Sequence, residues 1–188
     1  VATIDNAVAK MNRLMAQLQN ADVTGQKRPI DLVGELRGLV ASKRAARPVP
    51  RLTVETEKVE VAAAPDRLSA VIGHVIQNAQ DATPPDGKVE VILRATGDQV
   101  IVEVRDTGCG MDAEFIKTRL FRPFDSTKGL TGMGIGAYEC REVISAIGGQ
   151  VVVESQPGRG TSFRIILPRL SAAPVRSEAE QQGITDSV

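Results

Sequence analysis

Hydrophobic residues recur along this 188-residue chain with two periods, one typical of helices and one typical of strands. Near the start, apolar residues alternate spacings of four and three over about two heptads, at Ile4, Val8, Met11, Met15 and Leu18. A lone helix of this length is marginal in water, so we expect the seam to pack against another helix, in a hairpin or a homodimer. The alternative is that the seam packs onto its own domain.

Three further segments have the helical period, at residues 30–46, 67–82 and 135–147. Asp66 stands immediately before the second of them, and we expect its side chain to be the N-cap. Gly148-Gly149 follows the third segment, and such a pair is typical of a helix C-cap.

Short alternating segments predict strands at residues 52–54, 59–61, 88–95, 99–105, 150–154 and 161–167. Turn residues at Gly97-Asp98 and around Gly158 predict that the last four strands form two hairpins. The order of elements predicts an α+β domain: a two-layer α/β sandwich whose mixed sheet is covered by helices on one face, preceded by a helical extension.

The composition is typical of a globular protein, with 42% hydrophobic and 24% charged residues. The 23 basic and 23 acidic residues balance, so nothing favours nucleic acid or an anionic membrane surface as a partner. No apolar run is long enough to cross a bilayer and no signal peptide is recognisable, so we expect a cytoplasmic segment without membrane contact. The start without Met suggests a fragment, whose parent we expect to be anchored in the inner membrane.

The helix predicted at residues 67–82 has an unusual polar face. His74, Asn78 and Asp81 follow the spacing i, i+4, i+7 and lie nearly opposite the apolar face. Ordinary surface helices carry Lys and Glu at such positions, so this triplet is a candidate site. The amide oxygen of Asn78 is a suitable ligand for Mg²⁺, which prefers oxygen.

A glycine turn follows the strand predicted at 99–105. Asp106 ends that strand, and Gly108 and Gly110 follow it. A carboxylate held there can accept a hydrogen bond from an exocyclic amine, such as the N6 group of adenine, while the glycines let a base approach the backbone. The alternative is a simple turn.

A second glycine cluster, G-M-G-I-G at residues 132–136, opens the helix predicted at 135–147. Backbone N–H groups at a helix start suit phosphate, and Lys128 could neutralise phosphate charge. The cluster also matches the dinucleotide fingerprint G-x-G-x-x-A, with Glu154 at the expected distance. That fingerprint must follow a strand directly, and loop residues precede it here, so we reject the dinucleotide interpretation.

Together these motifs resemble those of the ATP-binding catalytic domain of sensor histidine kinases, in the GHKL superfamily that includes gyrase. The match covers about residues 50–168 and has the family's order: an N box (H-V-I-Q-N-A-Q-D-A), a G1 box (D-T-G-C-G-M), an F box (F-R-P-F), a G2 box (G-M-G-I-G) and a last glycine motif (G-R-G-T). The run G-M-G-I-G-A-Y-E-C-R-E is similar to that of PrsK-type kinases, which are associated with exosortase systems.

The resemblance implies a Bergerat ATP-binding fold in which Asn78 holds Mg²⁺, Asp106 reads adenine and about residues 121–133 form a mobile lid. It implies catalytic roles for Asn78, His74 and Lys128. The ATP contacts that it implies are Asn78, Asp81, Asp106, Gly108, Gly110, Met111, Phe121, Phe124, Thr127, Lys128, Gly132, Met133, Gly134, Ile135, Gly136 and Thr161.

The resemblance also divides the chain. Residues 1–25 correspond to the C-terminal helix of a dimerisation hairpin, 26–50 to a linker and the first helix of the catalytic domain, and 51–168 to the ATP-binding domain. We expect residues 169–188 to be a disordered tail, since they are polar and lack periodicity.

The implied function is a protein-histidine kinase of a two-component system, which forms a homodimer and passes phosphate to the receiver domain of a response regulator. The only histidine is His74, inside the N box, so the phosphoacceptor must lie outside these residues and autophosphorylation of this fragment is not expected. Three roles are open for His74: a general base, a polar residue that orients Asn78 or a water molecule, or a structural residue. We favour the second role, because transfer to histidine needs no activated water.

Two other functions stay open at this point. One is a hydrolytic ATPase of the same superfamily, and the other is a module that binds nucleotide or a partner without catalysis.

Overall fold

The computed structural model describes residues 26–123 and 135–170. Its helices are α2 (Leu32–Ser42), α3 (Pro65–Ala82), α4 (Ala113–Thr118) and α5 (Gly136–Ala146). Its strands are β1 (Arg28–Asp31), β2 (Arg51–Val54), β3 (Glu60–Ala63), β4 (Val89–Thr96), β5 (Gln99–Asp106), β6 (Gln150–Gln156) and β7 (Gly160–Pro168). The expected helix at residues 1–25 lies outside the described part of the chain.

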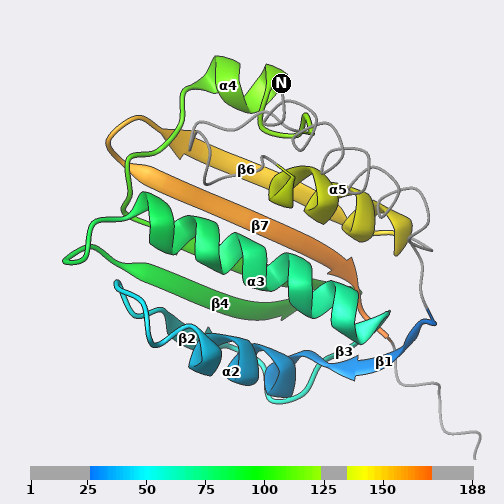
Figure 1. Cartoon of the computed structure of the whole chain (residues 1–188). Coiled ribbons are helices and arrows are strands. Elements are labelled where there is room, and N and C mark those ends of the chain that lie inside the picture. Colours follow the sequence, from blue (N-terminus) through cyan, green and yellow to red (C-terminus); the bar gives the residue numbers. More distant parts are fainter. Residues whose placement is uncertain (1–25, 124–134, 171–188) are drawn as a thin grey trace, which may run out of the picture.

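The fold is the predicted α+β sandwich. A five-stranded sheet has the order β2-β4-β5-β7-β6, and α2, α3 and α5 cover one face of it (Figure 1). β2 runs parallel to β4, whereas the other pairs are antiparallel, so the sheet is mixed as predicted. β1 and β3 form a separate two-stranded antiparallel sheet.

The core lies between the sheet and the helices and is almost entirely aliphatic. Every second residue of β5 faces it, and Val100, Val102 and Val104 are at most 1% exposed. On α3 the apolar face that the sequence predicts is buried, with Leu68 and Ile72 fully covered. Burying one such side chain stabilises the fold by about 1.5–3 kcal/mol. None of the described helices is long and apolar enough to cross a membrane.

Two predicted helix starts are wrong. The segment expected to be helical from residue 30 begins as β1, and α2 starts at Leu32 because Asp31 is the N-cap, accepting hydrogen bonds from the backbone N–H groups of Val33 (3.1 Å) and Gly34 (3.3 Å). Asp66 does not cap α3. The helix starts one residue earlier, at Pro65, whose fixed φ and missing N–H suit the first helical position.

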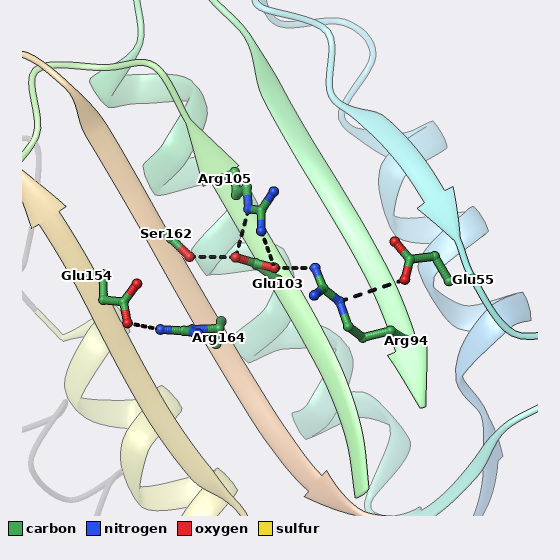
Figure 2. A network of polar contacts seen from close by, with 7 residues as sticks. All are labelled: Glu55, Arg94, Glu103, Arg105, Glu154, Ser162 and Arg164. Carbon is green, nitrogen blue, oxygen red and sulfur yellow. Dashed lines mark hydrogen bonds and ion pairs between the residues drawn. The ribbon is translucent and has the colours of Figure 1, made fainter. Parts of the chain in front are cut away.

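The face of the sheet without helices carries a polar network, shown in Figure 2, of Glu55, Arg94, Glu103, Arg105, Glu154, Ser162 and Arg164. At its centre Glu103, only 3% exposed, accepts hydrogen bonds from Arg94 Nη2 (2.6 Å), Arg105 Nε (2.7 Å) and Ser162 Oγ (2.7 Å). Burial raises the pKa of Glu103, but the hydrogen bonds of Arg105 and Ser162 and the charges of Arg105 and Arg94 outweigh it, so the pKa is lowered.

Candidate nucleotide site

Asp106 stands where β5 ends, with its carboxylate fixed from two sides. Oδ1 accepts the backbone N–H of Gly108 at 2.8 Å, and Asp106 is the register partner of Thr161 on β7. Burial raises the pKa of Asp106, and hydrogen bonds from Gly108 and Thr161 oppose the rise. The structure therefore brings together three of the residues that the sequence predicts for the adenine side, with the carboxylate held as a directed acceptor.

The glycines of this turn lie where no side chain fits. A Cβ atom on Gly108 would lie 2.4 Å from the carbonyl oxygen of Ala82, and one on Gly110 would lie 1.9 Å from that of Gln156. Gly110 also has a φ of +66°, which disfavours other residues. The turn is thus packed between the end of α3 and the β6–β7 hairpin.

Backbone hydrogen bonds hold the same arrangement. The N–H of Cys109 donates to the carbonyl of Ala82 (3.0 Å), and the carbonyl of Cys109 accepts the N–H of Gly158 (2.7 Å). The last glycine motif therefore braces the G1 turn. Holding the G1 turn in place is therefore a structural role of the last glycine motif.

Ser155 of β6 is a site residue that sequence reasoning missed. Its Oγ accepts the backbone N–H of Met111 (2.8 Å), donates to the carbonyl of Gly160 (2.8 Å) and lies 3.0 Å from Oγ1 of Thr161. Ser155 thereby fixes the predicted contact Met111 relative to β7. Its only signal in the sequence is a small hydroxyl residue just before a turn, which is too common to single out.

The polar face of α3 is exposed as predicted and meets the start of α5. A Cβ atom on Gly136 would lie 3.6 Å from Cβ of His74 and 3.7 Å from Nδ2 of Asn78. Asp81 accepts a hydrogen bond from Nε2 of Gln77 (2.7 Å) one turn away. The N box and the first residue of α5, distant in sequence, are therefore neighbours in the fold.

Phe121 lies half-buried against the core, and Arg141 of α5 holds it. The guanidinium of Arg141 lies 4.9 Å from the centroid of the Phe121 ring, and its Nη2 donates to the Phe121 carbonyl at 3.4 Å. Sequence reasoning missed Arg141, since only the packing of α5 brings it to this phenylalanine. Phe121 is thus anchored between the core and α5.

Part of the predicted site falls outside the described residues, namely Phe124, Thr127, Lys128, Gly132, Met133 and Gly134. Of the second glycine cluster the structure describes Ile135, which is the N-cap of α5, and Gly136, which begins it.

An open hollow of about 710 Å³ lies beside Asp106. Strand residues Asp106, Ser155 and Thr161 line it, together with Ile116 and Lys117 of α4. Helix α4 was not predicted from the sequence; Asp112 caps it by accepting a hydrogen bond from the backbone N–H of Phe115 (2.7 Å). Of the predicted site residues, Asp106 and Thr161 thus border an accessible space, which Arg105, Glu154 and Ser162 of the polar network also line.

Asn78 is the described residue that the sequence predicts as a ligand for Mg²⁺. Among the described residues no group of three His, Cys, Asp or Glu side chains is placed to bind a metal ion. Mg²⁺ typically takes one or two protein oxygens and fills its other positions with water and substrate phosphates. The amide of Asn78, on the exposed face of α3, suits that mode of binding.

This combination of a carboxylate at a strand end, a braced glycine turn and a polar helix face agrees with comparisons to known proteins. The family model described as "Histidine kinase-, DNA gyrase B-, and HSP90-like ATPase" matches residues 63–171, more than half of the chain. The chain belongs to this family. The match includes the N box, the G1 turn and the β6–β7 hairpin.

Similar proteins are sensor histidine kinases. The sensor histidine kinase ZraS of Klebsiella oxytoca is 35% identical over 132 residues, which are 69% of this chain and 28% of that protein. The mycobacterial sensor histidine kinase MprB has the same fold, with a TM-score of 0.67 at 22% identity, covering 76% of this chain and 97% of that one. Full-length ShkA, in complex with AMPPNP, matches with a TM-score of 0.69 at 26% identity, covering 84% of this chain and 34% of that one.

The chain thus contains the ATP-binding domain of this histidine kinase-like family. It spans only 28% of ZraS and 12% of the sensor kinase RcsC of Escherichia coli. The resemblance to PrsK-type kinases remains a prediction.

Proposed function

We propose that this domain binds ATP with Mg²⁺ and transfers the γ-phosphoryl group to a histidine outside these 188 residues. The single observation that carries the proposal is the meeting of four chain segments: the last glycine motif braces the turn that follows Asp106, and Asn78 of α3 lies beside the start of α5. One end of this arrangement suits a base and the other suits phosphates.

The adenine end is supported by the fixed carboxylate. Because Gly108 and Thr161 orient Asp106, it offers an acceptor to the exocyclic amine of adenine without reorganisation. The missing side chains of Gly108 and Gly110 let this turn pack against the backbone carbonyls of Ala82 and Gln156, which holds it in place beside Asp106. Asp106 and Thr161 also border the adjacent open hollow, so the carboxylate is accessible to a ligand.

The phosphate end is supported by α3 and α5. Backbone N–H groups at the start of α5 have no partner within the helix and favour anions. Asn78 would hold Mg²⁺ through its amide oxygen, and Lys128 would neutralise phosphate charge. Bound Mg²⁺ supplies charge neutralisation for the transferred group. The chain itself contributes by positioning the Mg²⁺ ligand: the packing of α3 on α5 holds Asn78 next to Gly136.

The partners follow from the same proposal. The acceptor histidine would belong to a dimerisation hairpin of which residues 1–25 supply the second helix, so the parent protein would act as a homodimer. The phosphate would pass to an aspartate in the receiver domain of a response regulator. The parent would be anchored in the inner membrane with this domain in the cytoplasm.

The test uses the parent protein with [γ-³²P]ATP and Mg²⁺. We expect labelling in the wild type and its loss, by at least about 100-fold, in Asn78→Ala, since positioning and Mg²⁺ supply most of phosphoryl-transfer catalysis. Asp98→Asn, in the β4–β5 turn far along the strands from Asp106, is the matched control and should label normally. Undiminished labelling in Asn78→Ala would overturn the site, and steady phosphate release without labelling would indicate a hydrolytic ATPase instead.

A further inference from the structure

His74 of α3 faces an acidic partner on α5. Its Nδ1 atom lies 3.8 Å from Oε2 of Glu139, which is an ion-pair distance slightly longer than a hydrogen bond. The side chain of Glu139 is 32% exposed and that of His74 is 53% exposed. Glu139 is in the first turn of α5, three residues after Gly136, where an added Cβ atom would lie 3.6 Å from Cβ of His74 and 3.7 Å from Nδ2 of Asn78.

Several other charged groups on or near these helices have partners of their own. Glu35 of α2 accepts a hydrogen bond from Ser69 of α3, and Lys43, which follows α2, donates a hydrogen bond to Gln77 (3.1 Å). On α5, Arg141 lies over Phe121 and approaches Glu142 at 3.8 Å. Asp81, on the same helix as His74, accepts from Gln77. Within the described residues Glu139 is the charged group that the structure pairs with His74.

Stability does not explain this pair. Ion pairs as exposed as this one contribute about 0–1 kcal/mol, and both helices already pack through their apolar faces. The pair instead joins the two elements that meet at the phosphate end of the site. Histidine nitrogens are chemically distinct, and the hydrogen bond made by one of them sets the protonation of the other.

We propose that Glu139 is a positioning residue that acts through His74. Its carboxylate takes the hydrogen bond of Nδ1–H, which orients the ring and leaves Nε2 as a hydrogen-bond acceptor next to Asn78. Nε2 then receives a hydrogen from a water on the phosphate side of the site and holds that water in place. The inference rests on the proposed function, since it assigns the water to the nucleotide's phosphate end. Hydrogen bonds of this kind are often long without ligand and shorten in the complex.

The first measurement needs no nucleotide. His74 is the only histidine of the chain, so ¹⁵N NMR of labelled imidazole reports on it alone. At about pH 8.5, two units above the ordinary histidine range, we expect the Nδ1–H tautomer to dominate in the wild type. An imidazole without such a partner favours Nε2–H, and Glu139→Ala should revert to it. Glu142→Ala, on the same helix but away from His74, is the matched control and should keep the wild-type spectrum.

The second measurement is catalytic. In the parent protein, Glu139→Ala should lower the rate of histidine labelling about tenfold with little change in the KM for ATP, as is usual when the partner of a site residue is removed. His74→Asn should do the same, and the double variant should lose no more than either single one.

The outcomes separate the two proposals. An Nε2–H tautomer in the wild type, or additive losses in the double variant, would overturn the role of Glu139 even if ATP binds. A wild type that shows the Nδ1–H tautomer but does not bind ATP would leave the pair in place and overturn the proposed function, and with it the assignment of the water.

Discussion

Oδ1 of Asp106 accepts the backbone N–H of Gly108 at 2.8 Å, so the last residue of β5 is tied to the turn that follows it. Thr161, its neighbour across the sheet, donates to the same carboxylate. Because both donors belong to segments braced by backbone contacts, the orientation of the carboxylate is a property of the fold and does not depend on a ligand. The site is therefore pre-organised at its adenine end.

The bracing of the G1 turn can be tested with two glycines that share a backbone conformation. Gly110 and Gly158 have φ values of +66° and +72°, but only Gly110 lacks room for a side chain. Gly158→Ala should lower the free energy of unfolding by about 1–2 kcal/mol, the usual cost of a left-handed residue. Gly110→Ala should cost about 1–3 kcal/mol more, because its Cβ would press on the Gln156 carbonyl at 1.9 Å.

Urea denaturation of both variants measures the difference. Equal losses for the two substitutions would show that the G1 turn and the β6–β7 hairpin are not packed as the structure has them.

The sheet network predicts an acid-sensitive contribution to stability. Glu103→Gln removes the charge at its centre and should lower the free energy of unfolding at neutral pH by about 1–3 kcal/mol. The pKa of Glu103 is lowered in the folded state, so its contribution is present above the ordinary value of 4.5 and is lost as the pH falls through the folded pKa. The difference between wild type and variant should shrink in acid.

Glu154→Gln is the control for this experiment. Glu154 pairs with Arg164 on the same face, but its side chain is 67% exposed, so its loss should cost at most about 1 kcal/mol. A wild-type-to-Glu103→Gln difference that stays constant from neutral to acid pH would contradict the account of the network.

The sequence predicts those features whose cause is local. The alternation in β4 and β5 and the two faces of α3 are visible because burial on one side imposes a period on the residues themselves. The turn after Asp106 can also be recognised in the sequence, because the close approach of neighbouring backbone leaves room only for glycine at Gly108 and Gly110.

Features that depend on tertiary contacts are not visible in this way. Ser155 and Arg141 act through partners 44 and 20 residues away in sequence, and no pattern around them marks those partners. α4 has only six residues and none of them is buried, so it leaves no hydrophobic period. Its one local sign is the N-cap residue Asp112, which accepts the backbone N–H of Phe115, and Phe115 is itself not buried.

The start of α3 shows how two local rules compete. Asp66 has a good N-cap side chain, but Pro65 before it suits the first helical position and moves the cap to Ala64, which makes no side-chain cap bond. A proline next to a capping residue should therefore take precedence when a helix start is predicted.

The most direct test of the nucleotide site is the affinity of the domain for ATP compared with inosine triphosphate, measured by calorimetry with Mg²⁺. The two ligands differ at position 6 of the base, where hypoxanthine carries a carbonyl oxygen in place of the exocyclic amine, and at the neighbouring N1, which carries a hydrogen in hypoxanthine. If Asp106 reads that amine, the wild type should prefer ATP by about 10–100-fold, the worth of a hydrogen bond to a charged group. Asp106→Asn should lose most of this preference, while Asp98→Asn should retain it. Equal binding of both nucleotides by the wild type, or an undiminished preference in Asp106→Asn, would contradict the assignment of Asp106 as the residue that recognises adenine.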